Sequence, residues 1–595
     1  MDKNFYWINS KEIPYRGFHF TDVVYEVLLT SAHPQDLLSF FKEIERLIQK
    51  GYYALGFITY EAGYLFEKKL VLLFKEPKTP IAHFIFFKNR NKIELFPLTK
   101  EPNYKISALK FNISKEEYKS AVHRIKEYIV KGDTYQINYT GKFHFIFEGD
   151  PWEFFVWLLF AQRCEYACYF SVPSYTILSL SPELFIKKSK DFIMSSPMKG
   201  TLKRGAFLAE DVEQKRALKK DLKTQAENVM ILDLIRNDLG RICEKGTVWC
   251  KELFKITTYP TLHQMISTIS GNLKTQSLFE IFKALFPCGS VTGAPKIRSM
   301  EIIGELEKEP RNVYTGAMGF ITPKGDFLFN VAIRSALLFP EKENKYKGEL
   351  GVGAGIVWDS SFYKEYLETK LKAQFFLKPQ PYFSLIETFK WDFSKDYDLL
   401  FLHYNRLLSS AKYFNFKIPS ELKSFPNFLS FIESSLSKSS TGKYKVRLLL
   451  SPEGKIDLEI SSLKQSGWEE PIKVLIIKRK TKVNLFHYHK TTLRKEYDEM
   501  RALALERGFT EVLFYNEKKE LLEGAISNLF LERDGLLYTP PVNLGILPGV
   551  LRESLIRAKK AVERVITIKD LENEQVLYIG NSVRGLGKVD SYIIM

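Results

Sequence analysis

The stretch TQAENVMILDLIRNDLGRI at residues 224–242 predicts a long helix. Helical spacing places Glu227, Ile231 and Leu234 near one face, so a carboxylate lies beside apolar side chains there. Around this helix, strand-like runs alternate with amphipathic segments. The runs are YYALGFITY (52–60), YTILSL (175–180) and DFLFNVAI (326–333), and a further helix is expected over 115–132. This half of the chain is therefore expected to mix helices and strands.

At 595 residues the chain exceeds what one hydrophobic core usually supports. The segment FLKPQPYF (376–383) has two prolines between a helical and a strand-like segment, and we place the domain boundary there. We expect a first domain over 1–376, a linker over 377–382 and a second domain over 383–595. The second half predicts helices at 398–414, 491–507 and 549–564, with strands at 444–450, 472–478, 511–516 and 526–532. The expected fold class is α+β throughout.

Composition narrows the functional classes. The net charge of +17 is spread along the chain among Glu and Asp residues, without a basic tail, so a nucleic-acid partner is not expected. The N-terminus has charges and a proline where a signal peptide needs an apolar run, and no segment reaches membrane-spanning length. The five cysteines form no C-x-x-C pair and suggest no disulfide framework. We expect a cytoplasmic protein without a membrane partner.

Eight unusual segments follow one another in the first half. They are GDTYQINYT (132–140), SPELF (181–185), PMKGT (197–201), AENVMILDLIRNDLGR (226–241), GSVTGAPK (289–296), RNVYTGAMGF (311–320), AIRSA (332–336) and GVGAGIVWDS (351–360). Together they resemble the chorismate-using enzymes over most of residues 50–375. The resemblance implies a β-sandwich with flanking helices. GVGAGI is not a dinucleotide-binding motif, because Ile356 stands where the third glycine would be needed.

Chorismate is a dicarboxylate with an allylic C4 hydroxyl, so its ring carboxylate suits a hard cation and its hydroxyl needs a proton donor. By the resemblance, Glu227 and Glu368 ligate Mg²⁺, and Glu365 helps directly or through water. Residues 365 and 368 are three apart and share a helix face. The other matched positions are Tyr314 and Arg334 for the enolpyruvyl carboxylate, the backbone at Gly353, Ala354 and Gly355 beside them, and His263 and Thr292 for the ring substituents.

Lys199 in PMKGT separates members of this family. Anthranilate synthases usually have a small residue there, whereas aminodeoxychorismate synthases resemble this chain in keeping a lysine. In that resemblance, the neutral amine of Lys199 attacks C2, Glu183 protonates the departing C4 hydroxyl, and ammonia then displaces the lysine from C4. Isochorismate and salicylate synthases also carry this lysine and use it to activate water, so Lys199 alone leaves amination open. The S-x-x-K pattern of serine acylases, which Ser196 to Lys199 also spell, is rejected because Pro197 suits no helix interior.

The second half holds five further segments, LHYNRLLSSAKYF (402–414), HKTTLRKEYD (489–498), LLEGAISNLF (521–530), TPPVNLGILPGVLRESL (539–555) and GNSVRGL (580–586). Their order resembles the fold-type IV pyridoxal-phosphate enzymes, which have two subdomains. The cofactor needs a lysine, an acid at the pyridine nitrogen and donors at the phosphate. The resemblance gives these roles to Lys490, to Glu523, and to Arg406, Ser582 and the amides of Val550 and Leu551; Asn581 and Thr388 are further candidates.

The fusion of the two halves narrows the expected function. An aminating chorismate enzyme joined to a lyase would convert chorismate and ammonia to 4-amino-4-deoxychorismate and then to 4-aminobenzoate, a folate precursor, and pyruvate. No G-x-C-x-G amidotransferase motif is present, so ammonia is expected from solution or from a separate glutamine amidotransferase subunit. A homodimer through the lyase domain is expected from the resemblance. The alternative is an anthranilate or isochorismate synthase fused to a class IV aminotransferase.

Overall fold

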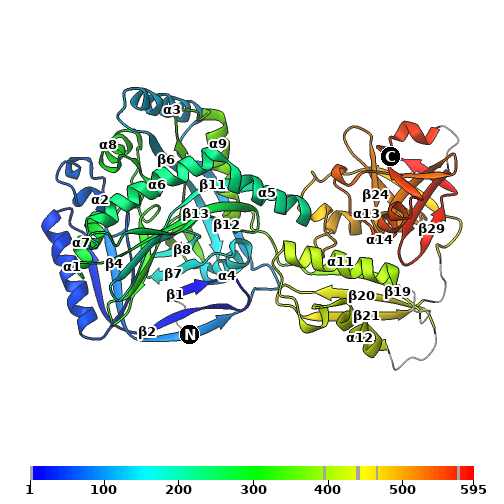
Figure 1. Cartoon of the computed structure of the whole chain (residues 1–595), viewed down its shortest axis with the longest axis horizontal. Coiled ribbons are helices and arrows are strands. Elements are labelled where there is room, and N and C mark those ends of the chain that lie inside the picture. Colours follow the sequence, from blue (N-terminus) through cyan, green and yellow to red (C-terminus); the bar gives the residue numbers. More distant parts are fainter. Residues whose placement is uncertain (1–3, 393–396, 437–441, 464–466, 573–575) are drawn as a thin grey trace. The chain divides into compact units, whose positions relative to one another are not determined.

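The computed structural model describes residues 4–392, 397–436, 442–463, 467–572 and 576–595 (Figure 1). The chain divides into two compact units. The first comprises Met1–Lys203 and Gln214–Tyr382, and the second comprises Arg204–Glu213 and Phe383–Met595. Each unit contains both helices and strands, which confirms the predicted α+β class. The finer domain limits, with a linker at 377–382, stay a prediction.

In the first unit, the described strands pair into one hydrogen-bonded network. The strands are β1 (Phe5–Asn9), β2 (Tyr15–Leu29), β3 (Tyr53–Ile58), β4 (Ala82–Leu95), β5 (Tyr104–Phe111), β6 (Gln136–Gly149), β7 (Tyr166–Val172), β8 (Tyr175–Ser181), β9 (Leu184–Ser189), β10 (Phe192–Ser196), β11 (Met198–Lys203), β12 (Trp249–Thr258), β13 (Leu262–Asn272), β14 (Gly293–Ala294), β15 (Ala317–Ile321), β16 (Phe327–Val331), β17 (Ser335–Lys342) and β18 (Lys345–Ile356). The helices are α1 (Pro34–Gln49), α2 (Ala62–Leu65), α3 (Lys115–Val130), α4 (Pro151–Gln162), α6 (Leu222–Gly240), α7 (Leu278–Leu285), α8 (Lys296–Leu306), α9 (Phe362–Leu371) and α10 (Gln374–Leu377). Helix α5 (Leu208–Lys220) is divided between the units, because its residues up to Glu213 belong to the second.

Strand pairing and helix packing bring several of the quoted motifs of the first half together. β6 pairs antiparallel with β18, with Ile137 opposite Ile356 and Gly353 opposite Thr140, so GDTYQINYT lies against GVGAGI. Helix α6 packs on β11 and β13, and α9 packs on β18. A Cβ built on Gly355 of β18 would lie 3.0 Å from Lys199 Nζ, so the lysine of β11 reaches the strand on which α9 packs.

An N-terminal cap and the burial of apolar side chains explain why α6 forms where the sequence predicts a helix. Asp221 caps its N-terminus, because its side chain accepts a hydrogen bond from the Thr224 amide at 2.8 Å. Ile231, Ile235 and Leu239 are buried in a large apolar cluster. The apolar helix α4 is likewise buried in the protein. Within the described parts of the chain, no helix is both long and apolar enough to cross a membrane.

The second unit contains two sheets (Figure 1). The strands are β19 (Leu385–Trp391), β20 (Tyr444–Leu450), β21 (Ile456–Ser462), β22 (Lys473–Lys478), β23 (Glu511–Tyr515), β24 (Leu521–Gly524), β25 (Asn528–Arg533), β26 (Leu536–Thr539), β27 (Ala561–Glu563), β28 (Val576–Asn581), β29 (Gly585–Lys588) and β30 (Ser591–Ile594), and the helices are α11 (Asp398–Tyr413), α12 (Phe425–Leu436), α13 (Lys495–Glu506) and α14 (Val550–Arg557). Strands β19 to β21 form a three-stranded sheet, and α11 packs on β19. The larger sheet carries α13 on β23. The prediction of one helix over 549–564 is wrong beyond residue 557, because Lys559 adopts a left-handed conformation and the chain continues as β27.

Residues 204–213 belong to the second unit although the first half of the chain surrounds them in sequence. The Arg204 guanidinium donates to both carboxylate oxygens of Asp211, at 3.0 and 2.8 Å, and stacks 3.8 Å from the centre of the Tyr413 ring. The Tyr413 hydroxyl donates to the Gly205 carbonyl at 2.7 Å. The sequence analysis did not anticipate this grouping.

Candidate active sites

Lys199 lies on β11, directly before the glycine of PMKGT. Gly200 has φ +84°, and a Cβ there would meet the Thr224 side chain at 2.0 Å. Because only glycine adopts this conformation readily and leaves room for Thr224, the strand bearing Lys199 packs closely on the start of α6. Glycine at position 200 thus places Lys199 next to the helix that carries Glu227.

Glu183 is buried, with 3% of its surface exposed. One carboxylate oxygen accepts a hydrogen bond from the Ser290 hydroxyl at 2.6 Å and from the Met198 amide at 3.4 Å. Burial raises the pKa of Glu183 to about 7, against the lowering effects of Ser290, Met198 and Lys199. Glu183 therefore keeps its proton over much of the neutral range, as a general acid requires.

Burial lowers the pKa of Lys199, and Lys372 lowers it further, while the carboxylates of Glu227 and Glu183 oppose the shift. A lowered pKa increases the fraction of neutral amine, which is the nucleophilic form. Lys372 itself donates to the Gly353 carbonyl at 2.9 Å and pairs with Glu368 at 2.9 Å. The sequence analysis did not single out Lys372.

The three predicted metal ligands come from two helices, Glu227 from α6 and Glu365 and Glu368 from α9. Burial raises the pKa of Glu365, a hydrogen bond from Ser360 lowers it, and the nearby Glu368 and Glu227 raise it further. This mutual repulsion indicates that the carboxylates face a common region. Their oxygens do not converge within 4.8 Å of one another in the described chain, since Glu368 turns to Lys372.

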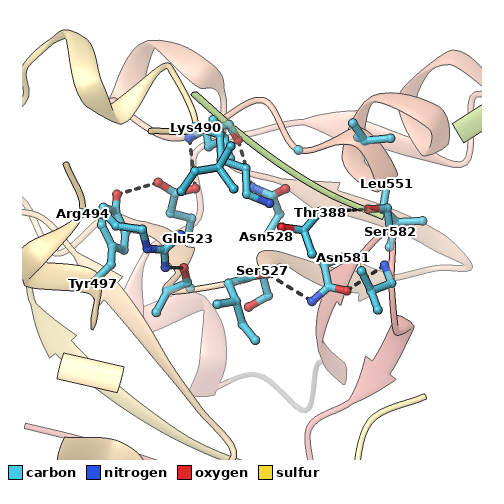
Figure 2. A pocket seen from close by; sticks show the side chains of 18 of the residues that line it. Thr388, Lys490, Arg494, Tyr497, Glu523, Ser527, Asn528, Leu551, Asn581 and Ser582 are labelled. Carbon is cyan, nitrogen blue, oxygen red and sulfur yellow. Dashed lines mark hydrogen bonds between the residues drawn. The ribbon is translucent and has the colours of Figure 1, made fainter. Parts of the chain in front are cut away.

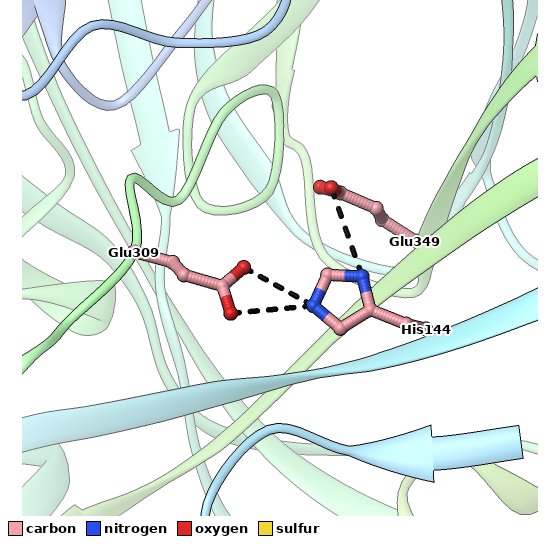
Figure 3. Close-up of side chains that lie close together, drawn as sticks. All are labelled: His144, Glu309 and Glu349. Atoms are coloured by element: carbon pink, nitrogen blue, oxygen red, sulfur yellow. Dashed lines mark hydrogen bonds and ion pairs between the residues drawn. The ribbon is translucent and has the colours of Figure 1, made fainter.

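A different trio meets that distance among the described residues, namely His144, Glu309 and Glu349 (Figure 3). His144 contacts Glu309 at 3.1 Å and lies 3.8 Å from Glu349. Glu349 also accepts hydrogen bonds from Lys142 and Lys78. Although burial raises the pKa of Glu349, these lysines lower it below its usual value. Lysine side chains thus already balance the negative charge of this trio, which we interpret as an ion-pair network.

Arg334 has the character of an anion-binding residue. Its guanidinium donates to the Gln162 side chain at 2.6 Å and lies 5.8 Å from the centre of the Tyr259 ring. Burial lowers its pKa, and in the described chain no carboxylate forms an ion pair with it. A half-buried guanidinium with no carboxylate partner among the described residues favours an anionic ligand. Tyr314 packs against Gly351, where a Cβ would meet its ring at 2.1 Å.

The remaining site residues predicted for the first half lie on strands and loops. Pairing between β18 and β17 ends at Leu350, so the other edge of Gly353 to Gly355 has no strand partner among the described strands. His263 is fully buried on β13, and its Nδ1 lies 3.1 Å from the Thr258 hydroxyl. The Thr292 hydroxyl donates to the Cys288 carbonyl at 2.9 Å, so its hydrogen stabilises its own loop.

The second unit holds a cavity of about 380 Å³ (Figure 2). Lys490, Glu523, Arg406, Val550, Leu551 and Ser582 all line it, as do Thr388 and Asn581. Further lining residues that the sequence analysis missed include Arg447, Arg494, Tyr497 and Asn528. The structure thus gathers the second-half residues predicted to hold pyridoxal phosphate around one cavity.

Lys490 and Glu523 supply the two reactive groups of this cavity. Burial and the nearby Arg406 lower the pKa of Lys490 to about 7, so much of its amine is neutral near physiological pH. Glu523 accepts hydrogen bonds from the Tyr497 hydroxyl at 2.7 Å and the Leu547 amide at 3.0 Å. Burial raises the pKa of Glu523 to about 7. A cation or an N–H donor stabilises a buried carboxylate of this kind. A protonated pyridine nitrogen would be such a donor.

Arg406 is held by a buried network. Its guanidinium donates to both oxygens of Glu387, at 2.9 and 2.7 Å, and to the Pro548 carbonyl at 3.1 Å. His403 bridges the same carboxylate, at 2.6 Å, to the Ser582 hydroxyl at 2.8 Å. Although burial raises the pKa of Glu387, Arg406 and His403 lower it to about 2. Glu387 therefore stays ionised and fixes the guanidinium at the cavity wall.

The start of α14 is shaped by a close contact. Gly549 precedes the helix without a side-chain cap, and a Cβ on Gly549 would lie 1.8 Å from the Asn528 amide oxygen. Asn528 in turn donates to the Leu547 carbonyl at 3.1 Å. The amides of Val550 and Leu551 are at the helix N-terminus, where backbone N–H groups suit a phosphate.

Comparison with known proteins identifies the two halves. Residues 21–378 match the family model described as chorismate binding enzyme. The chain belongs to the chorismate binding enzyme family. Residues 384–592 match the model for amino-transferase class IV. The predicted fusion of these two kinds of domain is therefore confirmed.

The curated relatives include aminodeoxychorismate synthase components and anthranilate synthase components. Aminodeoxychorismate synthase component 1 of Klebsiella aerogenes is 38% identical over 266 residues, which are 44% of this chain and 57% of that protein. Anthranilate synthase component 1 of Aquifex aeolicus is 35% identical over 292 residues, 49% of this chain and 58% of that protein. The match thus spans less than two thirds of either relative. Anthranilate synthase component I from Streptococcus pneumoniae TIGR4 shares the fold, with a TM-score of 0.53 at 24% identity over 61% of this chain and 92% of that one.

Proposed function

We propose that this chorismate binding enzyme converts chorismate and ammonia to 4-amino-4-deoxychorismate and water, and then converts that product to 4-aminobenzoate and pyruvate. The observation that carries the proposal is the presence of two nucleophilic lysines in one chain. Lys199 is electrostatically coupled to Glu183, whose pKa is about 7, and Lys490 lines a cavity whose polar groups suit pyridoxal phosphate.

In the first half, the neutral Lys199 amine forms a bond to C2 of chorismate while the C4 hydroxyl leaves. Glu183 gives its proton to that hydroxyl, which departs as water. Ammonia then bonds to C4 and displaces the Lys199 amine from C2. The Arg334 guanidinium, which forms no ion pair with a carboxylate in the described chain, holds the enolpyruvyl carboxylate during both displacements.

Glu227, Glu365 and Glu368 would hold Mg²⁺ in the first unit. Three carboxylates around one region present hard oxygen donors and a local excess of negative charge, which suits this cation. Bound there, Mg²⁺ would neutralise the ring carboxylate of chorismate. Glu368 would exchange its Lys372 partner for the metal.

Lys490, Glu523, Arg406, Ser582 and the α14 amides, which line the cavity of the second unit, would hold pyridoxal phosphate. When bound, the cofactor withdraws electrons from the amine-bearing carbon of the substrate. The neutral Lys490 amine takes the proton from C4 and delivers it to the departing pyruvate. Loss of pyruvate leaves the ring aromatic. Glu387 orients Arg406, and Tyr497 orients Glu523.

The rival function is an anthranilate or isochorismate synthase fused to a class IV aminotransferase, and the similarity to the Aquifex aeolicus relative supports it. Lys199 argues against the anthranilate activity, because a small residue is usual there. A separate glutamine amidotransferase is the proposed source of ammonia. A homodimer is the proposed assembly, and the cytoplasm the proposed location.

Withholding pyridoxal phosphate tests whether amination of chorismate precedes the release of pyruvate. Full-length protein depleted of pyridoxal phosphate, given chorismate, ammonium and Mg²⁺, should accumulate 4-amino-4-deoxychorismate, identified by chromatography and mass spectrometry. Adding pyridoxal phosphate should convert the accumulated compound to 4-aminobenzoate. Accumulation of anthranilate or isochorismate instead would contradict the proposal.

The pH dependence of the first step should report Glu183. Because the Glu183 proton is needed and the Lys199 amine must be neutral, the rate of chorismate consumption at saturating free ammonia should fall on the alkaline side, approaching about tenfold per pH unit once Glu183 is ionised and Lys199 is fully neutral. Glu183→Gln should lower the maximal rate by about 10² to 10³-fold and remove this alkaline limb. An alkaline limb that persists in the variant would assign the acid to another group.

A further inference from the structure

Lys490 is carried by an irregular part of the chain (Figure 2). Residues 488–490 belong to no helix or strand, and both His489 and Lys490 line the cavity of the second unit. The Lys490 carbonyl accepts a hydrogen bond from the Ile386 amide at 2.8 Å, which fixes the backbone after the lysine. Directly before the lysine, contacts with residues far apart in the sequence are made by the side chain of His489.

The His489 ring is buried and hydrogen-bonded at both nitrogens. Its Nε2 lies 3.1 Å from the Ala206 carbonyl oxygen, and its Nδ1 lies 2.9 Å from the Ser410 hydroxyl. Burial lowers the pKa of His489 to about 4, so the ring is neutral near pH 7. Because a carbonyl only accepts, Nε2 carries the hydrogen and donates to Ala206, and Nδ1 accepts from Ser410.

Aromatic packing fixes the plane of the same ring. The centre of the His489 ring lies 4.5 Å from the centre of Tyr413 and 4.7 Å from that of Phe414. Tyr413 ends α11, the helix that also carries Arg406 at the cavity wall. His489 therefore ties the chain that bears Lys490 to the helix that bears Arg406.

The Ala206 carbonyl lies in the segment Arg204–Glu213, which comes from the first half of the sequence and belongs to the second unit. This segment closes on itself, because Asp211 accepts hydrogen bonds from the Arg204 guanidinium and, at 3.1 Å, from the Gly205 amide. A Cβ on Gly205 would lie 2.3 Å from the Asp211 amide nitrogen, so glycine is needed for the close approach. A closed turn thus presents the Ala206 carbonyl to His489.

The ion pair that closes this turn is itself buried. The side chains of Arg204 and Asp211 are 6% and 1% exposed. Desolvation offsets much of the attraction within a buried ion pair, so such a pair is weak evidence for stability. We interpret this one as fixing the conformation of the turn, and with it the position of the Ala206 carbonyl.

We infer that His489 is a positioning residue for Lys490, and that the segment Arg204–Glu213 completes the second site by holding His489 through the Ala206 carbonyl. This inference rests on the proposed attachment of pyridoxal phosphate to Lys490. Without the hydrogen bond from His489, the Lys490 amine stays in the cavity but is poorly placed to bond to the cofactor. Part of the first half of the sequence therefore serves the reaction of the second unit.

The test is a titration of full-length protein, depleted of pyridoxal phosphate, with added pyridoxal phosphate. The signal is the visible absorption that appears when the aldehyde carbon bonds to the Lys490 nitrogen with loss of water. His489→Phe keeps a ring of similar shape and loses both hydrogen bonds, so the apparent Kd should rise by roughly tenfold. In His489→Gln the amide nitrogen can still donate to Ala206, and Kd should stay within about threefold of wild type.

Arg204→Ala separates positioning from direct contact with the cofactor. His489 borders the cavity, whereas Arg204 is not among the residues that line it. Opening the turn should raise Kd by roughly threefold to tenfold, although no residue of the cavity is changed. With supplied 4-amino-4-deoxychorismate and saturating cofactor, Arg204→Ala should lower kcat by a similar factor and leave KM within about twofold. This variant also carries the test if His489→Phe does not fold.

His83 offers a matched control in the first unit. It is also a buried histidine, and its Nδ1 lies 2.5 Å from the Tyr175 hydroxyl. His83→Phe should lower the thermal midpoint and leave the Kd for pyridoxal phosphate unchanged.

Two results would overturn the inference. One is a wild-type Kd and kcat in both His489→Phe and Arg204→Ala, even with a lower thermal midpoint, because the segment would then only fasten the chain. The other is an equal rise of Kd in His489→Gln and His489→Phe. Failure of the proposed function is recognised separately, because wild-type protein would then gain no visible absorption with pyridoxal phosphate.

Discussion

Replacing Lys199 with alanine should abolish the conversion of chorismate to 4-aminobenzoate, with a loss of about 10³-fold or more, as expected when a nucleophile is removed. The physical reason is that alanine has no amine to attack C2. Conversion of supplied 4-amino-4-deoxychorismate should continue at the wild-type rate, because that step uses the second unit. Both rates are measured by the appearance of 4-aminobenzoate.

Lys188 provides the control for this variant. It is also a buried lysine with a pKa lowered by burial, but its amine donates to the Gly325 carbonyl at 3.0 Å. Lys188→Ala should leave both rates within about twofold. If Lys199→Ala also lost the reaction of supplied 4-amino-4-deoxychorismate, the two sites would not be separable as we propose.

Replacing Lys490 with alanine should have the reverse effect. Chorismate consumption should continue, 4-amino-4-deoxychorismate should accumulate, and 4-aminobenzoate formation should fall by about 10³-fold or more. In the proposed mechanism this variant lacks both the attachment point for the cofactor and the base that moves the C4 proton. The ratio of intermediate to product, followed by chromatography, is the measurement.

Lys473, exposed at the start of β22, is the matching lysine control. Lys473→Ala should form 4-aminobenzoate at the wild-type rate. Wild-type lyase turnover in Lys490→Ala would show that another residue moves the proton. Loss of chorismate consumption in the same variant would show that the first step depends on the second site.

Local patterns in the sequence were enough to predict elements whose ends depend on nearby residues. The helix predicted at 224–242 is observed at Leu222–Gly240, and the strand predicted at 444–450 is observed at Tyr444–Leu450. The helix predicted over 549–564 ended early because a single left-handed residue, Lys559, turns the chain. Helical periodicity does not report such a residue.

Contacts between residues far apart in the chain could not be predicted from the sequence. Glu387 and Arg406 are separated by 19 positions, and nothing in LIETFKW marks Glu387 as the partner of that guanidinium. Gln136 stood inside a quoted motif, but the sequence does not reveal that its buried side-chain amide makes no hydrogen bond among the described residues once the strands are paired. The grouping of residues 204–213 with the second unit depends likewise on the Arg204 contacts with Asp211 and Tyr413.

The most direct test of the account is the product formed by the purified full-length protein from chorismate, ammonium, Mg²⁺ and pyridoxal phosphate. We expect 4-aminobenzoate and pyruvate in equal amounts, with nitrogen from labelled ammonium in the 4-amino group. Anthranilate, isochorismate or salicylate as the main product would contradict the assignment of the first site, and therefore the central claim.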